Sequence, residues 1–573
     1  MDDKIIQKAS QWLGESYDEK TRKQVQQMME NDHEALTDAF YTNLEFGTGG
    51  MRGKMGAGTN RMNVYTVAMA TQGLANYLLK SFPNEEIGLA VAYDCRHNNL
   101  LFAKTVADVL SANGIKVYVF DGIRPTPLLS FAIRHLKCKS GIVITASHNP
   151  KEYNGYKVYW EDGAQLVSPH DKNVIDEVLN IGDISEVKRD ANPSLVLSVG
   201  KEIDDIFLKE CKKQVFYPDI SHKEKIKIVF TPLHGTGGVL IPQILQESGY
   251  TSFYPVEEQM VEDGDFPTAE SPNPEEADAL TLAINKAREL NADIVMATDP
   301  DADRIGLAVK DEDNNYVLLN GNQTGAIIVK YILSQWKENG LFKGKEMTVK
   351  TIVTSELLKD ISQSYGVKQY DVLTGFKWIA DVIRRKEGEE VFIVGLEESF
   401  GYMIGDFVRD KDAVTAALLI AEIATYCRLQ HKSLFDMLLD IYIEYGFYKE
   451  GLVNIYREGK KGAEEISVMM EAFRNNPPET FAGSSVVMLK DYLKGEAFDL
   501  TTANSILLDL PKSNVLQFIT ADGSKISVRP SGTEPKIKFY VSVKEKLESA
   551  ADYRSVNAIL DQKISQIAEQ LGV

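Results

Sequence analysis

A serine at the end of an apolar segment is the first residue whose setting suggests chemistry. Residues 141–145 are apolar and mostly β-branched, which predicts a buried strand. The next residues, Ala-Ser-His-Asn-Pro at 146–150, stop that strand, because proline restricts the residue before it. The Ser147 hydroxyl is therefore predicted at the carboxyl end of a core strand, where open α/β sheets bind ligands. An ordinary serine in a turn is the alternative, and the other loops of the chain weigh against it.

An aspartate-rich loop is the second candidate site. It follows the strand predicted at 292–298 and has three aspartates at alternate positions: Asp299, Asp301 and Asp303. Carboxylates roughly 4 Å apart repel one another even near a surface, so we expect a counter-cation among them. Oxygen donors alone favour Mg²⁺ or Ca²⁺ over Zn²⁺. An EF-hand is excluded, because Arg304 and Lys310 stand where it needs glycine and glutamate.

A third loop carries groups that suit sugar hydroxyls. Glu397, Glu398 and Ser399 follow the strand predicted at 391–394 and offer hydrogen-bond acceptors and a hydroxyl on rigid backbone. Paired glutamates could also indicate a glycosidase. Neighbouring residues of an extended chain face opposite sides, however, so Glu397 and Glu398 are poorly placed as a catalytic pair.

Two loops with arginine could bind phosphate. Arg529 is followed by hydroxyls and amides at 531–533, and the strands predicted at 525–528 and 536–543 flank this cradle. Arg52 lies in the glycine-rich segment 44–53, whose backbone could approach an anion closely. A flexible surface loop is the alternative that this segment alone favours. The glycine-rich turn at 231–238 matches neither a dinucleotide-binding fingerprint nor a P-loop, and we assign it no ligand.

Taken together, these loops resemble those of the α-D-phosphohexomutase superfamily, which contains phosphoglucomutases and phosphomannomutases. The segment Thr145-Ala-Ser-His-Asn-Pro150 with Asn154-Gly-Tyr-Lys157 is similar to the family's active-site serine loop. The remaining loops are similar to its Gly-Thr-x-Gly-x-Arg, metal-binding, sugar-specificity and phosphate-binding segments. The resemblance runs from about residue 44 to about residue 540 and is closest to the long phosphoglucomutase/phosphopentomutase subtype.

The resemblance implies a role for each matching residue. Ser147 is implied to carry a phosphoryl group, with Arg52 facing it. Lys157, if its pKa is lowered, is the first candidate for the base that takes the sugar proton, and His148 is the second. Lys411 aligns with a family lysine near the substrate phosphate, although a surface lysine explains it equally well. The implied substrate-binding residues are Arg304, Thr374, Glu397, Ser399, Lys411, Arg529, Ser531, Gly532 and Thr533. The implied metal ligands are Asp299, Asp301, Asp303 and phosphorylated Ser147.

The expected reaction is the interconversion of glucose 1-phosphate and glucose 6-phosphate, with Mg²⁺ as cofactor and glucose 1,6-bisphosphate as intermediate and activator. Phosphopentomutase, phosphomannomutase and glucose-1,6-bisphosphate synthase share the chemistry and stay open as alternatives. A Mg²⁺-dependent sugar phosphatase is a further alternative, for which the phosphate cradle would be surplus. A non-catalytic sugar-phosphate-binding protein is the least favoured, because both the hydroxyl loop and the metal loop are intact.

Length and composition restrict the class of protein. The chain has 573 residues, which suggests roughly three to five domains. Its net charge of −20 argues against nucleic acid or an anionic membrane as a partner. The four cysteines are widely separated, and we find no secretory signal and no apolar segment long enough to span a bilayer. We therefore expect a cytoplasmic protein that binds a small sugar phosphate, as a monomer or weak homodimer.

The elements that must position these loops alternate as βα units. Strands are predicted at 87–93 and 116–120, with helices at 100–113 and 127–136, which favours a mainly parallel sheet. The predicted fold is α/β, with three similar mixed α/β domains and a C-terminal α+β domain around a central cleft. The predicted boundaries are 1–215, 216–319, 320–444 and 445–573. Residues 4–42 are predicted as one or two helices without chemistry, and 275–290 as a further helix.

Overall fold

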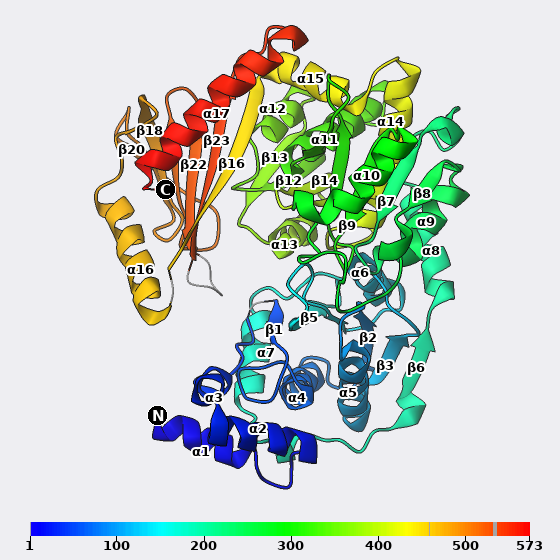
Figure 1. The fold of residues 1–573 in the computed structure, drawn as a ribbon, viewed down its shortest axis with the longest axis vertical. Coiled ribbons are helices and arrows are strands. Elements are labelled where there is room, and N and C mark those ends of the chain that lie inside the picture. The colour runs from blue at the N-terminus through cyan, green and yellow to red at the C-terminus, as the bar shows by residue number, and fades with distance from the viewer. Residues whose placement is uncertain (1, 48, 458, 531–535, 573) are drawn as a thin grey trace. The chain divides into compact units, whose positions relative to one another are not determined.

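The computed structural model describes residues 2–47, 49–457, 459–530 and 536–572 (Figure 1). The chain forms two compact units. The first unit contains Met1–Asn320, Phe376–Gly395 and Ser399–Tyr426. The second unit contains Gly321–Gly375, Leu396–Glu398 and Cys427–Val573.

Three helices, rather than the predicted one or two, begin the first unit: α1 (Asp3–Gln11), α2 (Glu19–Asn31) and α3 (His33–Phe40). Asp32 separates the last two, because its side chain accepts the Ala35 amide and begins a new helix. The aromatic rings of Trp12, Tyr17 and Phe40 pack with Tyr65 of α4 (Val64–Ser81). Figure 1 shows these helices in dark blue beside α4. The three helices share this small hydrophobic core with residues of α4 and of the segment 181–187.

A six-stranded sheet in the first unit has the order β1-β5-β4-β2-β3-β6. Its strands are β1 (Gly50–Lys54), β2 (Gly88–Tyr93), β3 (Lys116–Phe120), β4 (Ser140–Ile144), β5 (Tyr153–Trp160) and β6 (Val196–Val199). Strands β2, β3, β4 and β6 run parallel, as the βα pattern predicted, and β5 pairs antiparallel with both β4 and β1. The helices of this part are α4, α5 (Asn99–Ala112), α6 (Thr126–His135), α7 (His170–Leu179) and α8 (Lys201–Lys212). The predicted strands and helices between 87 and 145 are confirmed within one or two residues.

The first unit also contains a five-stranded sheet of order β11-β10-β9-β7-β8. Its elements are β7 (Ile228–Thr231), α9 (Gly237–Glu247), β8 (Phe253–Pro255), α10 (Thr281–Leu290), β9 (Ile294–Thr298), β10 (Ile305–Lys310) and β11 (Tyr316–Leu319). The helix predicted at 275–290 is wrong in its first turns, where Ala277–Leu280 is a 3₁₀ helix. Asn273 accounts for the late start, because its side chain accepts the Glu275 amide and holds a turn there.

Residues 321–445 supply further α/β elements. They are α11 (Gly321–Glu338), β12 (Glu346–Thr351), α12 (Leu357–Ser364), β13 (Lys368–Val372), α13 (Phe376–Lys386), β14 (Val391–Glu397), β15 (Gly401–Ile404), α14 (Ala413–Leu429) and α15 (Leu434–Tyr445). In the second unit β12 pairs with β13 in parallel. Strand β14 is longer than the predicted 391–394, so that Glu397 is its last residue.

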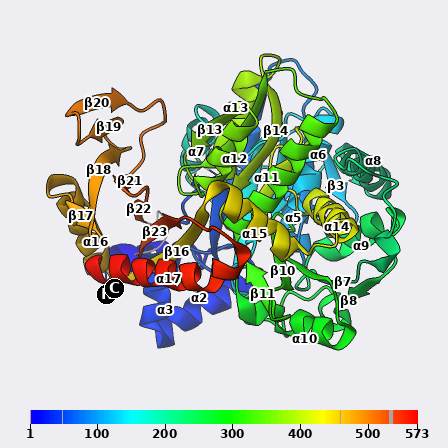
Figure 2. The same cartoon turned by 90° about the horizontal axis from the view of Figure 1, so that it is seen from above.

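The C-terminal part of the second unit is the predicted α+β fold. Its strands are β16 (Phe447–Tyr456), β17 (Thr480–Phe481), β18 (Ser484–Asp491), β19 (Glu496–Asp499), β20 (Asn504–Leu507), β21 (Leu516–Thr520), β22 (Lys525–Pro530) and β23 (Lys536–Glu545). All neighbouring pairs are antiparallel. The helices are α16 (Gly459–Asn475) and α17 (Tyr553–Gln570), and α17 packs along β16 and β23 (Figure 2).

Short 3₁₀ helices at Ile184–Glu186, Pro193–Leu195, Lys223–Lys225, Glu257–Gln259 and Ala550–Asp552 lie between these elements. No single helix among the described residues is long and apolar enough to cross a membrane. The bent pair α14–α15 together meets the length and composition of a membrane span.

Candidate active site

The predicted serine lies at the predicted strand end, in a sharply bent backbone. Strand β4 ends at Ile144, and Ser147 adopts a left-handed conformation with φ of 51°. Such a backbone costs a side-chain-bearing residue about 1–3 kcal/mol, which surrounding contacts must offset. The Ser147 amide donates to Thr145 Oγ1 at 2.8 Å, and its hydroxyl donates to Asp299 Oδ2 at 2.5 Å. The serine loop and the aspartate loop therefore meet, as predicted, in the first unit.

The three aspartates form a buried cluster that fits a cation. Asp299, Asp301 and Asp303 follow β9, and one oxygen of each lies within 4.8 Å of the others. The oxygens Asp301 Oδ1 and Asp303 Oδ1 are buried and have no hydrogen-bond partner among the described residues. Burial raises the pKa of Asp299, and the other two carboxylates raise it further. Unpaired buried carboxylate oxygens are costly without a positive charge, and hard oxygens suit Mg²⁺.

Two lysines contact the same aspartates. Lys157, on β5, places its Nζ 2.7 Å from Asp301 Oδ2 and 3.4 Å from Asp303 Oδ2. Lys411, just before α14, places its Nζ 3.0 Å from Asp303 Oδ2 and 3.2 Å from Asp410 Oδ1. Lys411 is only 7% exposed, so its interpretation as a surface lysine is wrong.

The pKa of Lys157 is raised, opposite to the lowering that we expected of a general base. Burial on its own lowers this pKa, but the carboxylates of Asp301 and Asp303 outweigh the burial. Lys157 in turn shifts the pKa of Asp301. Burial raises the Asp301 pKa, but the charge of Lys157 outweighs the burial and holds it below its usual value. In this geometry Lys157 is therefore an ammonium that neutralises the aspartate loop.

Arg52 contacts the serine loop, and His148 lies beside Ser147. Arg52 stands on strand β1 opposite Gly155, and its Nη1 donates to Asn149 Oδ1 at 3.1 Å. The interpretation of this segment as a flexible loop is thus wrong for residues 50–54. His148 Nδ1 lies 3.3 Å from Ser147 Oγ, and burial followed by the charges of Arg304 and Arg52 lowers its pKa.

Arg304 belongs to the aspartate loop itself. Its backbone amide donates to Asp299 Oδ1 at 3.1 Å, and its Nε lies 3.8 Å from Asp303 Oδ1. Its Nη1 donates to Glu275 Oε1, which lies in the turn that replaces the predicted helix start. Arg304 therefore adds a positive charge beside the cluster.

Several residues that support the site were not predicted. Thr126, the first residue of α6, donates its amide to Asp301 O at 2.9 Å and its hydroxyl to Asp301 Oδ2 at 2.9 Å. The glycine-rich turn that we left without a ligand supports the aspartate loop. Thr236 donates its amide to Pro300 O at 2.8 Å, and a Cβ on Gly235 would lie 2.3 Å from Pro300 Cα. Close backbone packing thus explains Gly235.

Arg96 is a further residue that the sequence analysis missed. It is 3% exposed and donates to backbone carbonyls of the serine loop. Asp94 lies beside it and accepts the Thr145 hydroxyl at 2.6 Å. The signal available in the sequence was the charged pair Asp94 and Arg96 directly after the strand predicted at 87–93.

Thr374, Glu397 and Arg529, three of the candidate sugar and phosphate residues, lie in the second unit. Glu397 accepts the Gly375 amide at 2.8 Å, next to Thr374. Glu398 accepts the hydroxyls of Thr351 and Thr354 at 3.0 Å and 3.1 Å, so the two glutamates have different partners. Ser399 is half-buried and belongs to the first unit.

The described part of the phosphate cradle is Arg529 at the end of β22. Ser531, Gly532 and Thr533 lie outside the described residues. Burial raises the pKa of Tyr540, and the charges of Glu398 and Glu397 add to this, whereas Arg529 opposes it. The electrostatic environment of Tyr540 therefore includes both glutamates and Arg529.

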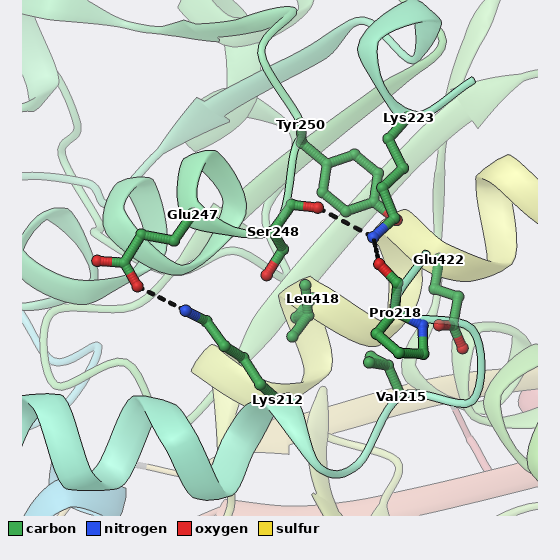
Figure 3. A pocket seen from close by; sticks show the side chains of 9 residues that line it. All are labelled: Lys212, Val215, Pro218, Lys223, Glu247, Ser248, Tyr250, Leu418 and Glu422. Carbon is green, nitrogen blue, oxygen red and sulfur yellow. Dashed lines mark hydrogen bonds and ion pairs between the residues drawn. The ribbon is translucent and has the colours of Figure 1, made fainter. Parts of the chain in front are cut away.

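A separate cavity of about 150 Å³ opens in the first unit (Figure 3). Its charged groups are already paired: Lys212 donates to Glu247 at 2.5 Å, and Lys223 donates to the carbonyls of Pro218 and Ser248. Glu422 accepts two backbone amides. The cavity contains no group of catalytic residues, and we assign it no ligand.

Comparison with known proteins matches four domain models of one family, in order along the chain. Models of phosphoglucomutase/phosphomannomutase α/β/α domains I, II and III match residues 43–185, 205–312 and 320–445, and the C-terminal domain model matches 452–558. Phosphoglucomutases of Staphylococcus aureus and Staphylococcus haemolyticus are each 38% identical over 510 residues, which is 88% of this chain and 91% of theirs.

Solved structures show the same fold. The open form of pp63/parafusin from Paramecium has a TM-score of 0.67 at 19% identity, and covers 93% of this chain and 96% of its own. A phosphoglucomutase/phosphomannomutase family protein from Burkholderia thailandensis has a TM-score of 0.64 at 17% identity, and covers 92% and 97%.

Proposed function

The chain belongs to the phosphoglucomutase/phosphomannomutase family, and from this premise we propose that it interconverts glucose 1-phosphate and glucose 6-phosphate. The observation that carries the proposal is the 2.5 Å hydrogen bond from Ser147 Oγ to Asp299 within the buried aspartate cluster. A hydroxyl at that point can hold a phosphoryl group beside carboxylates, lysines and arginines. Phosphoryl transfer depends chiefly on such positioning and charge stabilisation.

The proposed cycle begins with phosphorylated Ser147. A free hydroxyl of the sugar phosphate attacks the phosphorus, the bond from phosphorus to Ser147 Oγ breaks, and glucose 1,6-bisphosphate forms. The hydroxyl proton passes to a base. The bound bisphosphate then reorients, so that its other phosphate faces Ser147. Ser147 Oγ attacks the phosphorus of that phosphate and the bond from phosphorus to the sugar oxygen breaks, which restores the phosphoserine and releases the isomeric monophosphate.

Asp299, Asp301 and Asp303 would hold Mg²⁺ together with an oxygen of the phosphoryl group on Ser147. The fit rests on the oxygens Asp301 Oδ1 and Asp303 Oδ1, which no described residue satisfies. When bound, the ion would offset negative charge on the transferring group. The positive charges of Arg52, Arg304 and the Lys157 ammonium would help to offset the same negative charge.

Lys157 and His148 stay the two candidates for the base, but Lys157 would first have to lose the proton that its raised pKa holds in this geometry. Lys157 is held by two aspartates, and His148 Nδ1 lies 3.3 Å from Ser147 Oγ. Substitution of each by glutamine separates them, because only loss of the base should remove the corresponding limb of the pH–rate profile.

Substrate recognition is proposed for the residues of the sugar and phosphate loops. Glu397 accepts the Gly375 amide beside Thr374, which supports a role in reading sugar hydroxyls, and Arg529 at the end of β22 is a donor suited to phosphate. The residues proposed to contact substrate are Arg304, Thr374, Glu397, Ser399, Lys411, Arg529, Ser531, Gly532 and Thr533.

Turnover of sugar 1-phosphates with and without the matching bisphosphate tests the function. A mutase acting on glucose should prefer glucose 1-phosphate over mannose and ribose 1-phosphates in kcat/KM, require catalytic bisphosphate and release no inorganic phosphate. A preference for ribose or mannose would reassign the sugar within the family. Steady release of inorganic phosphate without bisphosphate would support the phosphatase alternative instead.

A further inference from the structure

The carbonyl oxygens of the serine loop converge on one buried guanidinium. Arg96 Nη2 donates to Ser147 O at 2.6 Å and also to Asn149 O. Its Nη1 donates to Pro150 O at 2.8 Å and to Tyr153 O at 3.1 Å. Three carbonyls of the serine loop and that of Tyr153, the first residue of β5, thus accept from a single side chain, which fixes the direction of their peptide groups.

The guanidinium is itself held from several sides. Its Nε lies 3.4 Å from Asp94 Oδ2, and both side chains are fully buried. The ring of Phe266 lies over the guanidinium, 5.0 Å from Cζ to the ring centroid. Asp94 also accepts the hydroxyl of Thr145, which in turn accepts the Ser147 amide. The loop conformation and the position of Arg96 therefore determine each other.

The direction of the Ser147 carbonyl decides the direction of the next amide. In a trans peptide the C=O and N–H groups point in opposite directions. Because Ser147 O faces Arg96, the His148 N–H faces away from it. Within residues 2–47, 49–457, 459–530 and 536–572, that amide donates to no protein acceptor.

We propose that Arg96 is a positioning residue that aims the His148 amide at the phosphoryl group on Ser147 Oγ, so that this amide is a hydrogen-bond donor to the phosphoserine. The proposal rests on the proposed function, because it needs the phosphorylated serine. A backbone donor held in place before the reaction stabilises negative charge without reorganising, as in an oxyanion hole. The His148 amide belongs to the residue directly after Ser147, and is therefore within reach of an oxygen of the phosphoryl group on Ser147 Oγ.

The direct test needs no substitution in the measured protein. The full-length chain has eight histidines, so ¹⁵N-histidine labelling gives a small set of amide signals. The His148 signal is identified by its absence from the spectrum of His148→Gln. On phosphorylation by glucose 1,6-bisphosphate, the His148 amide proton should move downfield more than any other histidine amide. An unmoved His148 signal in phosphorylated protein would overturn the proposal.

Arg96→Lys tests the positioning role. Lysine has three donors on a compact ammonium, and cannot serve four carbonyls as the planar guanidinium does. We expect kcat to fall about 100-fold with little change in KM, and the downfield shift of His148 to be lost. Arg61→Lys is the matched control, because Arg61 also binds backbone carbonyls, those of Asp38 and Asn60, at the N-terminal helices. It should leave kcat and the His148 signal unchanged.

The outcomes distinguish failure of the Arg96 positioning role from failure of the proposed mutase function. If wild-type protein neither takes phosphate from the bisphosphate nor turns over, the proposed function fails and this inference with it. If wild-type protein is phosphorylated and active while folded Arg96→Lys keeps kcat within twofold, only the positioning role is overturned. Should Arg96→Lys fail to fold, the wild-type spectrum still decides whether the His148 amide contacts the phosphoryl group.

Discussion

Charge balance at the aspartate cluster is settled by a few side chains. Lys157 and Lys411 contact two of the three buried carboxylates, yet among the described residues two of the carboxylate oxygens, Asp301 Oδ1 and Asp303 Oδ1, accept no hydrogen bond. The lysines alone therefore leave coordination positions open. The proposed divalent cation would occupy these positions, so loss of a single carboxylate should weaken its binding greatly.

Asp301→Asn should remove most of kcat together with the dependence on Mg²⁺. The substitution deletes one negative charge from the proposed metal site, and it also breaks the ion pair with Lys157. Activity is measured over a Mg²⁺ titration and in chelator. Exposed Asp278→Asn is the control and should behave as wild type. A normal rate of Asp301→Asn in chelator would refute the metal assignment.

The sequence indicated Ser147 and the aspartates because their spacing is local and unusual. It could not indicate Arg96, whose partners are carbonyls about 50 residues later, nor the burial of Lys411, which depends on Asp303 and Asp410. It also gave the wrong direction for the pKa of Lys157. Burial alone suggested a lowered value, and the two aspartates that reverse it are distant in the chain.

At the scale of elements, the βα units were predictable because their strands and helices carry regular apolar patterns. Strands β1 and β5 were not, because β1 is glycine-rich and the buried β5 contains Asn154 and Lys157. These polar residues are accommodated by tertiary partners, not by local preference. The two missed strands pair with each other and carry Arg52 and Lys157 to the site.

Gly50→Ala tests the pairing of β1 with β5. Gly50 has φ of 120°, and a Cβ there would lie 1.8 Å from Tyr156 O. We expect a loss of about 2–6 kcal/mol in unfolding free energy, with lower activity because Arg52 moves. Gly114→Ala is the control: its φ is 80°, but no atom lies within 4 Å of the added Cβ, so it should cost about 1–2 kcal/mol and leave activity unchanged. Equal losses in the two variants would contradict the close packing.

The start of α2 gives a prediction about pH. Asp18 accepts hydrogen bonds from the Thr21 amide and hydroxyl and from the Tyr65 hydroxyl. Burial raises the pKa of Asp18, but these donors outweigh it and hold the pKa at about 2. The unfolded value is about 3.9, so the stabilisation is complete above roughly pH 4 and is lost as pH falls toward 2.

Asp18→Asn should therefore lower the unfolding free energy at neutral pH. The difference in unfolding free energy between wild type and Asp18→Asn should shrink toward zero near pH 2. Denaturant unfolding of both proteins across this range measures the difference. A gap between wild type and Asp18→Asn that stays constant over the whole range would show that the carboxylate charge is not what stabilises this helix start.

At the scale of the whole molecule, buried charges join the C-terminal sheet to the α/β elements of the second unit. Lys525 on β22 donates to the carbonyls of Ile352 and Thr354 at 3.0 Å and 2.9 Å, and to Glu356 at 2.7 Å. Lys350 binds Glu356 and Asp371 at 3.0 Å and 2.9 Å. Such a network explains why these parts form one compact unit. Such interactions cannot be predicted from local sequence. The domain boundaries predicted at 215, 319 and 444 stay predictions.

Lys525→Met should destabilise the second unit by about 3–5 kcal/mol, because it leaves Glu356 without one of its buried partners. Calorimetry of the full chain should show a lower transition for the second unit and an unchanged one for the first. Lys544→Met is the control, because Lys544 is a third exposed in its 3.1 Å pair with Asp360 and should cost at most about 1 kcal/mol. Equal shifts for both variants would argue against a buried network.

Phosphate exchange through Ser147 is tested most directly by the fate of labelled phosphate. The full-length chain is mixed with ³²P-labelled glucose 1,6-bisphosphate, freed of sugar, and then given unlabelled glucose 1-phosphate. The label should first reside on Ser147 in an acid-stable linkage, and then leave within a sugar bisphosphate at least as fast as turnover. Ser147→Ala should take up no label and have no mutase activity. Undiminished turnover without label on Ser147, in wild type or in the variant, would contradict a covalent phosphoserine route.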